Sequence, residues 1–392
     1  MDKPYYPFRP ISTITILAKT LGIHEKLLLN LANKVDDSYT EFLINVKGKD
    51  RTVYEPKHDL KRLQKRINHR IFEKVQYPPY LQGGIKDSLN KRDYVENANA
   101  HCETNPNIII SLDIKSFYDN IKADYVFKVY KNFFNFPHDV ASLLTKLTTF
   151  KNKVPQGACT SSYLANLIFF NTEYSLVSKF RSKGICYTRL LDDITLSSNK
   201  ILPEEVISAS IKNVIAMFRK YNLKHNNKKT RVESQKNAKD GFKITGLWVG
   251  HSKPKTTRHD RRYIRLLVKI CENKFNDEKY SSEYHTLWNK TSGLIAKLTR
   301  LDQSNHLNLR ERMSAILPLY DDKEKDKIIR ECKVILKYNN KVAFTVGQVN
   351  AINRLIGKLG ILARTNKSLS KVWRTRVRKH CHSLPSKRSI WL

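Results

Sequence analysis

The sequence predicts an α+β protein whose antiparallel sheet lies in the middle of the chain. Two observations lead to this expectation. Short apolar runs that end at aspartates, within residues 108–113 and 186–193, have the length and composition of buried strands. Leucine and isoleucine residues recur at helical spacing in the segments before and after these runs.

The first hundred residues are expected to contain two amphipathic helices. Residues 11–34 and residues 59–73 each carry apolar side chains three or four positions apart, with lysine and arginine between them in the second segment. The apolar positions are Leu17, Leu21, Leu27, Leu28 and Leu31 in the first helix, and Leu60, Leu63, Ile67 and Ile71 in the second.

The middle of the chain supplies the expected strands. Residues 108–112 form a buried strand that ends at Asp113, and a helix is expected over residues 164–177. Residues 186–191 and 194–197 read as a hairpin with Asp192-Asp193 at its tip. Residues 243–249 predict one more strand.

The last third of the chain is expected to be helical and basic as far as about residue 385. Its first helix is marked by apolar residues at helical spacing, which are Tyr263, Leu266, Leu267 and Ile270.

Charge is the strongest global property. The chain has 72 Lys+Arg against 36 Asp+Glu, a formal net charge of +36. Residues 251–392 hold 32 basic and 12 acidic residues, and no acidic residue follows Lys341. Such a protein repels itself and is expected to bind a polyanion, mainly through its last third. Nucleic acid is the first interpretation; an anionic membrane surface or a ribosome-like assembly is the alternative.

Several classes of protein are excluded by composition. At 40% hydrophobic and 10% aromatic residues, the chain is too apolar to be disordered. It has no uncharged apolar run of 18 residues and no signal-peptide core after Met1, so we expect neither a membrane span nor export. Six scattered cysteines without a CxxC pair predict free thiols and a cytoplasmic location.

Three aspartates are the main candidates for chemistry. Asp113 ends one predicted strand, and Asp192 and Asp193 lie at the tip of the hairpin. If these strands are neighbours, the carboxylates converge, and two charges about 4 Å apart repel by roughly 4 kcal/mol at an effective dielectric of 20. Oxygen ligands without His or Cys favour Mg²⁺ or Mn²⁺, and two such ions support in-line phosphoryl transfer. The alternative is a solvated Asp-Asp turn.

A second candidate segment is Pro155-Gln156-Gly157, which is followed by small hydroxyl residues and then by a predicted helix. A flexible turn of this kind lets the backbone approach a base pair or a sugar closely. Its hydroxyl residues also fit an N-cap of the following helix.

The order of these motifs resembles the palm of reverse transcriptases. Asp113, Pro155-Gln156-Gly157 and Asp192-Asp193 follow one another as they do in that family. Four further motifs are similar to those of retron reverse transcriptases. One is Asn97-Ala98-Asn99-Ala100-His101, which resembles NAxxH, and another is Ile244-Thr245-Gly246, which resembles VTG. Between these two lies Asn226-Asn227-Lys228-Lys229-Thr230, and Arg51-Thr52-Val53-Tyr54-Glu55-Pro56 resembles the finger motif.

The resemblance implies a right-hand polymerase, with fingers, a palm that contains the antiparallel sheet, and a helical thumb, plus a basic helical C-terminal extension. Residues 1–105 would hold the N-terminal helices and fingers, and residues 106–250 the palm with finger insertions. Residues 251–315 would form the thumb and residues 316–392 the extension.

The resemblance also implies roles for individual residues. Asp113, Asp192 and Asp193, with the carbonyl of Ile114, would bind two Mg²⁺ ions, Mn²⁺ being an alternative. Lys229 would protonate the leaving pyrophosphate. Contacts to the incoming dNTP would come from Lys86, Arg92, Tyr118, Gln156 and Gly157, where Tyr118 excludes the 2′-OH of an rNTP.

Nucleic acid would contact a third group of residues, which are Asn97, His101, Thr245, Gly246, Arg374, Arg376 and Arg378. Lys86, Arg92, Lys229 and His101 also have a structural interpretation as surface or core residues. A zinc site built from His380, Cys381 and His382 is not expected, because tetrahedral sites need more widely spaced ligands.

Two departures from the family pattern are evident. Leu190 stands where the family has the Tyr of Tyr-x-Asp-Asp, the ring that supports the primer end, and Cys159 and Ser162 replace expected prolines.

The implied function is RNA-directed DNA polymerisation of retron type. A dedicated noncoding RNA is copied into single-stranded DNA for anti-phage defence, beside a separately encoded effector protein. Leu190 and the long C-terminal part keep open a non-retron defence reverse transcriptase with protein-primed or weakly templated synthesis. A non-catalytic RNA-binding scaffold is the third hypothesis.

Overall fold

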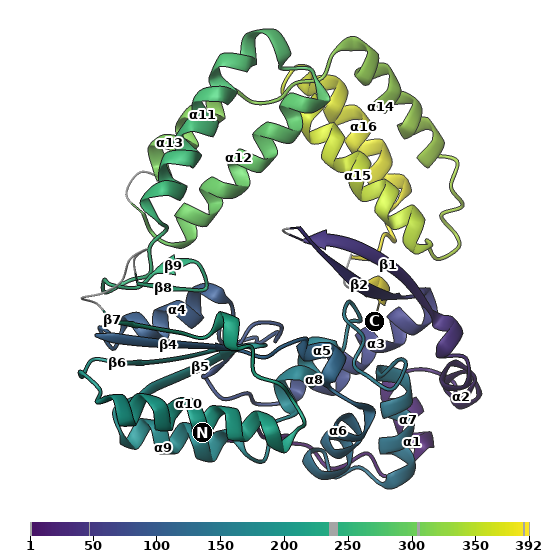
Figure 1. The fold of residues 1–392 in the computed structure, drawn as a ribbon. Coiled ribbons are helices and arrows are strands. Elements are labelled where there is room, and N and C mark those ends of the chain that lie inside the picture. The colour runs from purple at the N-terminus through teal and green to yellow at the C-terminus, as the bar shows by residue number, and fades with distance from the viewer. Residues whose placement is uncertain (1, 47, 235–241, 304–305, 387–388, 392) are drawn as a thin grey trace. The chain divides into compact units, whose positions relative to one another are not determined.

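The computed structural model describes residues 2–46, 48–234, 242–303, 306–386 and 389–391. The chain forms two compact units, Met1–Lys255 and Thr256–Leu392 (Figure 1). Among the described residues, every strand lies in the first unit, and the second unit is helical. The predicted α+β class is confirmed.

A five-stranded sheet forms the centre of the first unit. Its strands, in spatial order, are β3 (Leu81–Gln82), β5 (Cys186–Leu190), β6 (Asp193–Ser198), β4 (Ile108–Asp113) and β7 (Arg231–Ser234). Neighbouring strands are antiparallel except β3 and β5, which run parallel. The expected antiparallel sheet is therefore present, with one short parallel strand at its edge.

Helices cover both faces of this sheet. α9 (Glu173–Ser182) and α10 (Glu204–Lys220) lie on one face, and α4 (Tyr94–Cys102) lies on the other (Figure 1). β4 is buried along almost its whole length. A strand covered on both faces needs apolar side chains in succession, which explains the unbroken run at its start.

The N-terminal region begins with α1 (Ile14–Leu21) and α2 (Glu25–Asn33). The helix predicted over residues 11–34 is thus two helices, because Gly22 at φ 62° ends α1 in the left-handed conformation. A two-stranded hairpin follows, formed by β1 (Tyr39–Val46) and β2 (Lys49–Pro56). Further helices of this unit are α3 (His58–Arg70), α5 (Phe117–Asn120), α6 (Ala123–Lys128), α7 (His138–Thr148) and α8 (Ser161–Leu167).

Two predicted elements differ from the structure. The helix expected over residues 164–177 is divided, because α8 ends at Leu167 and α9 starts at Glu173 after a series of turns. The first turn residues, Ile168, Phe169 and Phe170, are apolar and pack into or against the core, so the apolar pattern continues into the break; the polar Asn171 and Thr172 follow directly before α9. The strand expected over residues 243–249 is a small hairpin, since Thr245 and Gly246 reverse the chain at φ 49° and 80° between β8 (Lys243–Ile244) and β9 (Leu247–Trp248).

The second unit has two apolar cores. The first core joins α11 (Arg258–Glu278), α12 (Ser282–Arg300) and α13 (His306–Ala315). The second core joins α14 (Asp322–Ile335), α15 (Val346–Leu362) and α16 (Lys367–His380). None of the helices in the described parts of the chain has the length and apolar composition needed to cross a bilayer. The finer division into four segments stays a prediction.

One buried histidine ties α4 to the sheet. The Nδ1 atom of His101 lies 2.6 Å from the Ser197 hydroxyl, and its Nε2 atom lies 2.7 Å from the Thr188 hydroxyl. The ring is fully buried, and this burial lowers the pKa of His101 to about 3. His101 therefore stays neutral in the folded protein at any pH above about 4.

This histidine makes the fold sensitive to mild acid. Its pKa is depressed on folding, so its contribution to stability is present above the unfolded pKa of about 6.5 and is lost as the pH falls toward the folded value. Between pH 7 and pH 5 we expect the free energy of unfolding to fall by about 2 kcal/mol from this group. His101→Gln should remove this part of the pH dependence of the free energy of unfolding, measured by urea unfolding at each pH. An unchanged pH dependence would contradict the assignment.

Candidate active site

The three candidate aspartates meet at one end of the two central strands. Asp113, the last residue of β4, is the cross-strand partner of Asp193, the first residue of β6. The backbone N–H of Ile114 donates to the carbonyl of Asp192 at 3.1 Å, which fixes the hairpin tip beside β4. Residues about 80 positions apart are thus neighbours because β4 and β6 pair in this register.

Burial and mutual repulsion destabilise the charged forms of Asp192 and Asp193. Burial, followed by the charges of Asp192 and Asp113, raises the pKa of Asp193 to about 7. The pKa of Asp192 is also raised, mainly by burial and further by the charge of Asp113, while Lys229 and Arg51 oppose the shift. The site therefore favours a bound cation, which would lower the energy of all three carboxylates.

Asp113 already holds a cation in this structure. The Lys229 ammonium donates to its Oδ2 atom at 2.5 Å, and the Asn226 side chain donates to Oδ1 at 2.7 Å. The Asn226 N–H also donates to the carbonyl of Asp113 at 2.9 Å. Sequence reasoning named Lys229 but gave Asn226 no role, although its position three residues before Lys229 was a usable signal.

The donor chemistry of this site fits divalent ions that prefer oxygen. Asp113, Asp192 and Asp193 offer only carboxylate oxygens, and Asp113 binds a positive ammonium where a metal ion would lie. No group of three or more His, Cys, Asp and Glu side chains in the described residues is already arranged as a metal cage. In the part of the chain that the structure describes, the Lys229 ammonium, and no preassembled metal cage, is the cationic partner of Asp113.

Tyr118 lies beside these carboxyls. It follows Ser116, whose φ of 48° turns the chain sharply from β4 into α5. Burial first, and then the charge of Asp192, raise the pKa of Tyr118 to about 12. The phenol stays neutral at physiological pH, and its ring is half-buried against the apolar core.

The Gln156-Gly157 turn is fixed against the β1–β2 hairpin. The N–H of Tyr54 donates to the carbonyl of Gln156 at 2.8 Å. Gly157 has φ 109°, and a Cβ atom there would lie 2.6 Å from Val53 and 3.0 Å from the Tyr54 carbonyl. Only glycine fits this close approach between the turn and β2.

The two predicted cations of the fingers differ in their surroundings. The Arg92 guanidinium is 5% exposed and binds Asp87 at 2.8 Å and the carbonyls of Tyr77, Pro78 and Leu81. Its donors hold a loop together, so the predicted contact to a triphosphate finds no support. Lys86 is half exposed and lies 3.3 Å from Glu73.

The NAxxH-like and VTG-like segments pack on each other. The Thr245 hydroxyl donates to the carbonyl of Tyr94 at the start of α4 at 3.0 Å. Asn97 is buried, and its Oδ1 atom has no hydrogen-bond partner among the described residues. His101 faces the sheet, and Gly246 is exposed at the tip of its turn.

The three predicted arginines of α16 are not equivalent. Arg374 is half-buried and turns toward the carbonyl of Ile356 on α15, 3.5 Å away. Arg376 lies over the Trp373 ring at 5.4 Å and is exposed, as is Arg378. Arg376 and Arg378 are thus the accessible cations of the three.

The unusual leucine before the Asp-Asp pair has its own niche. A Cβ atom at Gly83 would lie 2.5 Å from Leu190 Cδ1, and one at Gly84 would lie 2.5 Å from the Cβ of Ser162. Two of the three residues that depart from the family pattern, Leu190 and Ser162, therefore lie against the same double-glycine turn.

Comparisons with known proteins agree with this geometry. A family model described as "Reverse transcriptase (RNA-dependent DNA polymerase)" matches residues 33–249. The chain is 42% identical over 382 residues to the retron Se72 reverse transcriptase of Salmonella heidelberg (strain 579083-10), an alignment that covers 96% of this chain and 98% of the relative. It is 32% identical over 330 residues to the retron Ec48 reverse transcriptase of Escherichia coli, covering 81% and 79%. The chain therefore belongs to the retron reverse transcriptases, a family of RNA-directed DNA polymerases.

Proposed function

We propose that this enzyme copies a dedicated, structured noncoding RNA into single-stranded DNA with Asp113, Asp192 and Asp193 as the ligands of two Mg²⁺ ions. The observation that carries the proposal is the pairing of β4 with β6, which opposes Asp113 and Asp193 and fixes Asp192 beside Ile114. As in the retron family, the product would serve anti-phage defence together with a separately encoded effector protein.

The carboxylates and the Ile114 carbonyl would hold the ions, and Mn²⁺ meets the same preference for hard oxygen ligands. When bound, the ions stabilise the attacking and leaving oxygens of an in-line displacement. Lys229 holds its proton firmly, because its hydrogen bond to Asp113 raises its pKa. This bond keeps the ammonium charged, and once an ion replaced it at Asp113 the ammonium would be free to donate its proton to the pyrophosphate that leaves.

The other site residues would bind and select the nucleotide. The half-buried Tyr118 ring occupies the space beside Asp192, where a 2′-OH of an incoming rNTP would clash with it. Gln156 and Gly157 would contact the nascent base pair from a turn fixed against β2. Lys86 would neutralise part of the triphosphate charge.

RNA would be held largely by the basic second unit. Its cations neutralise phosphates without reading sequence. The accessible pair on α16, Arg376 and Arg378, belongs to this surface, whereas Arg374 is directed toward α15. Gly246 and Thr245 would meet the RNA at the tip of their hairpin, and Asn97 and His101 would support that hairpin through α4.

A second function is favoured by one observation, the Leu190 side chain in its glycine niche. Without a tyrosine ring to support the primer end, protein-primed or weakly templated DNA synthesis becomes an alternative. Sequencing the nucleic acid that copurifies with the enzyme separates the two: retron synthesis yields a defined DNA linked to RNA, and the alternative yields repetitive or protein-linked DNA.

The proposed metal ligands can be tested by charge removal. Asp192→Asn with Asp193→Asn should reduce dNTP incorporation to below about one-thousandth of wild type, because the ions lose their ligands. RNA binding should stay within about twofold, since phosphates are bound elsewhere. The matched control is Asp36→Asn with Asp37→Asn, an exposed Asp-Asp pair outside the site. If the Asp192→Asn, Asp193→Asn variant still incorporated dNTP, the assigned metal ligands would be wrong under both polymerase hypotheses.

The role of Tyr118 predicts a change in sugar selectivity. Tyr118→Ala should lower the preference for dNTP over rNTP by about tenfold or more, because the steric barrier to a 2′-OH disappears. Tyr118→Phe keeps the ring and should keep the selectivity. Steady-state incorporation of matched dNTP and rNTP pairs measures the selectivity of each variant. Equal selectivity in wild type and both variants would contradict the proposed role of Tyr118.

RNA binding should depend steeply on salt. The logarithm of the binding constant should fall linearly with the logarithm of salt concentration, by about 0.7 to 0.9 per phosphate neutralised. Arg376→Gln with Arg378→Gln should reduce the slope by about one to two. Lys323→Gln with Lys327→Gln, two exposed lysines of the mixed-charge helix α14, is the control. A flat wild-type profile would contradict the polyanion interpretation.

A further inference from the structure

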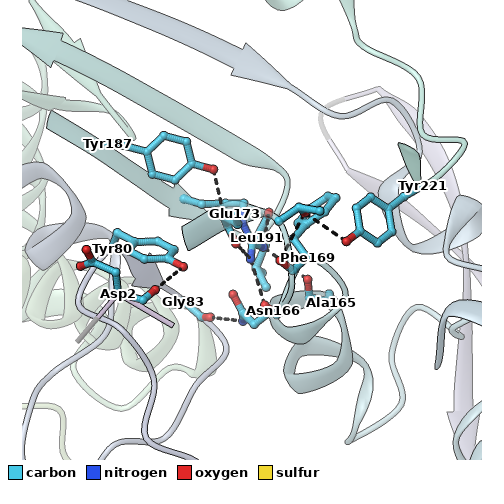
Figure 2. A network of polar contacts seen from close by, with 12 residues as sticks. Asp2, Tyr80, Gly83, Ala165, Asn166, Phe169, Glu173, Tyr187, Leu191 and Tyr221 are labelled. Atoms are coloured by element: carbon cyan, nitrogen blue, oxygen red, sulfur yellow. Dashed lines mark hydrogen bonds and ion pairs between the residues drawn. The ribbon is translucent and has the colours of Figure 1, made fainter. Parts of the chain in front are cut away.

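A charged group lies deep in the first unit, away from any role assigned above. Arg189 on β5 is completely buried, and its partner Glu173, the first residue of α9, is 2% exposed. The guanidinium donates to both carboxylate oxygens, at 2.6 Å from Nε and 2.8 Å from Nη2. Tyr187 donates to the same carboxylate at 2.7 Å, so Glu173 is held from two sides (Figure 2).

The remaining donors of Arg189 reach backbone carbonyls of two other segments. Nη1 lies 3.2 Å from the carbonyl of Leu191 and 3.3 Å from that of Ala165, and Nη2 lies 2.9 Å from that of Asn166. Leu191 belongs to the turn that carries Asp192, whereas Ala165 and Asn166 belong to α8. One side chain thus connects the aspartate turn with the helix that follows the Gln156-Gly157 turn.

The bond to Leu191 matters because of the backbone there. Leu191 has φ 58°, a left-handed conformation that a side chain such as leucine rarely adopts. Its carbonyl and the N–H of Asp192 share one planar peptide unit. A donor that fixes this carbonyl therefore fixes the plane from which the Asp192 side chain departs, and the Ile114 bond fixes the next peptide.

A second link extends from Asn166 to the double-glycine turn. The Asn166 amide donates to the carbonyl of Gly83 at 3.0 Å (Figure 2). Gly83 is also the residue against which Leu190 packs. Leu190 is thereby held against Gly83 on one side of Leu191, and Asp192 is held through its two peptide units on the other side. Movement of Arg189 would loosen the turn, α8 and this contact together.

We propose that Arg189 is a positioning residue that sets the orientation of Asp192 by holding the Leu191 carbonyl, and that Glu173 is the counter-charge that allows this guanidinium to be buried. The proposal rests on the proposed function, since it assumes that Asp192 is a metal ligand. It assigns to a buried ion pair a geometric role in catalysis.

Arginine suits this role, and lysine does not. A planar guanidinium has five donors in a fixed fork and can bind a carboxylate and several carbonyls at the same time. An ammonium has three donors on one atom and would keep the contact to Glu173 while losing the distant carbonyls. Stability alone does not require the pair, because apolar residues of similar volume often replace buried ion pairs without loss.

Replacing the buried ion pair by apolar residues separates a positioning role of Arg189 from a stabilising one. Arg189→Met leaves Glu173 charged and unpaired, so we expect a lower unfolding midpoint. Arg189→Met with Glu173→Met removes both charges and should recover most of the midpoint lost in the single variant, the remainder reflecting the Tyr187 hydroxyl and the carbonyls left without partners. Turnover of dNTP should nevertheless fall about 100-fold in both variants, with KM for dNTP within about threefold, because the bound nucleotide is unaffected and the Asp192 ligand is misplaced. Arg189→Lys should show the same loss of kcat.

All proteins are assayed well below their own unfolding midpoints, with Asp192→Asn and the Asp36→Asn, Asp37→Asn control in the same experiment. If the double methionine variant or Arg189→Lys recovers wild-type kcat while Asp192→Asn is inactive, Arg189 has only a structural role and the inference is overturned. If wild type incorporates no dNTP, or if Asp192→Asn stays active, the proposed function itself has failed. A kcat loss that persists at restored stability supports the positioning role.

Discussion

Repulsion between carboxylates is the constraint on which the rest of this structure depends. Asp192 and Asp193 lie beside Asp113, where burial and the charges of neighbouring carboxylates oppose their ionisation. A cation relieves this repulsion, and in this structure Lys229 supplies one to Asp113. The surroundings serve to keep three mutually repelling groups together: the β4–β6 register, the Asn226 bonds and the fixed turn at Leu191 all act against their separation.

The scaffold holds this site through contacts between segments that are far apart in sequence. The Gln156-Gly157 turn rests on β2, the VTG-like turn rests on α4, and α8 reaches the Gly83-Gly84 turn through Asn166. Each of these contacts uses a backbone carbonyl as acceptor. The site is therefore held by main-chain acceptors, to which the Thr245 and Asn166 side chains and the Tyr54 N–H donate.

Part of the fold and part of the candidate site could be predicted from the sequence, for physical reasons. Strand β4 and the β5–β6 hairpin were predictable because their apolar runs are short and end in acidic residues, and the order of the motifs led to the family. The break between α8 and α9 was not, because Ile168, Phe169 and Phe170 continue the apolar run before the polar Asn171 and Thr172. The surroundings of Arg92 and Arg189 depend on how neighbouring segments fold back on them. The resemblance indicated a triphosphate contact for Arg92, and the residue type indicated nothing for Arg189.

The double-glycine turn has a consequence for how this polymerase can change. Leu190 fills space that exists only because residue 83 has no side chain, and Ser162 does the same beside residue 84. Reintroducing the family's tyrosine at position 190 would place a larger ring in a niche shaped for a leucine. Positions 83, 84, 162 and 190 are therefore expected to form one compensating set, in which a substitution is accepted only in the company of its neighbours.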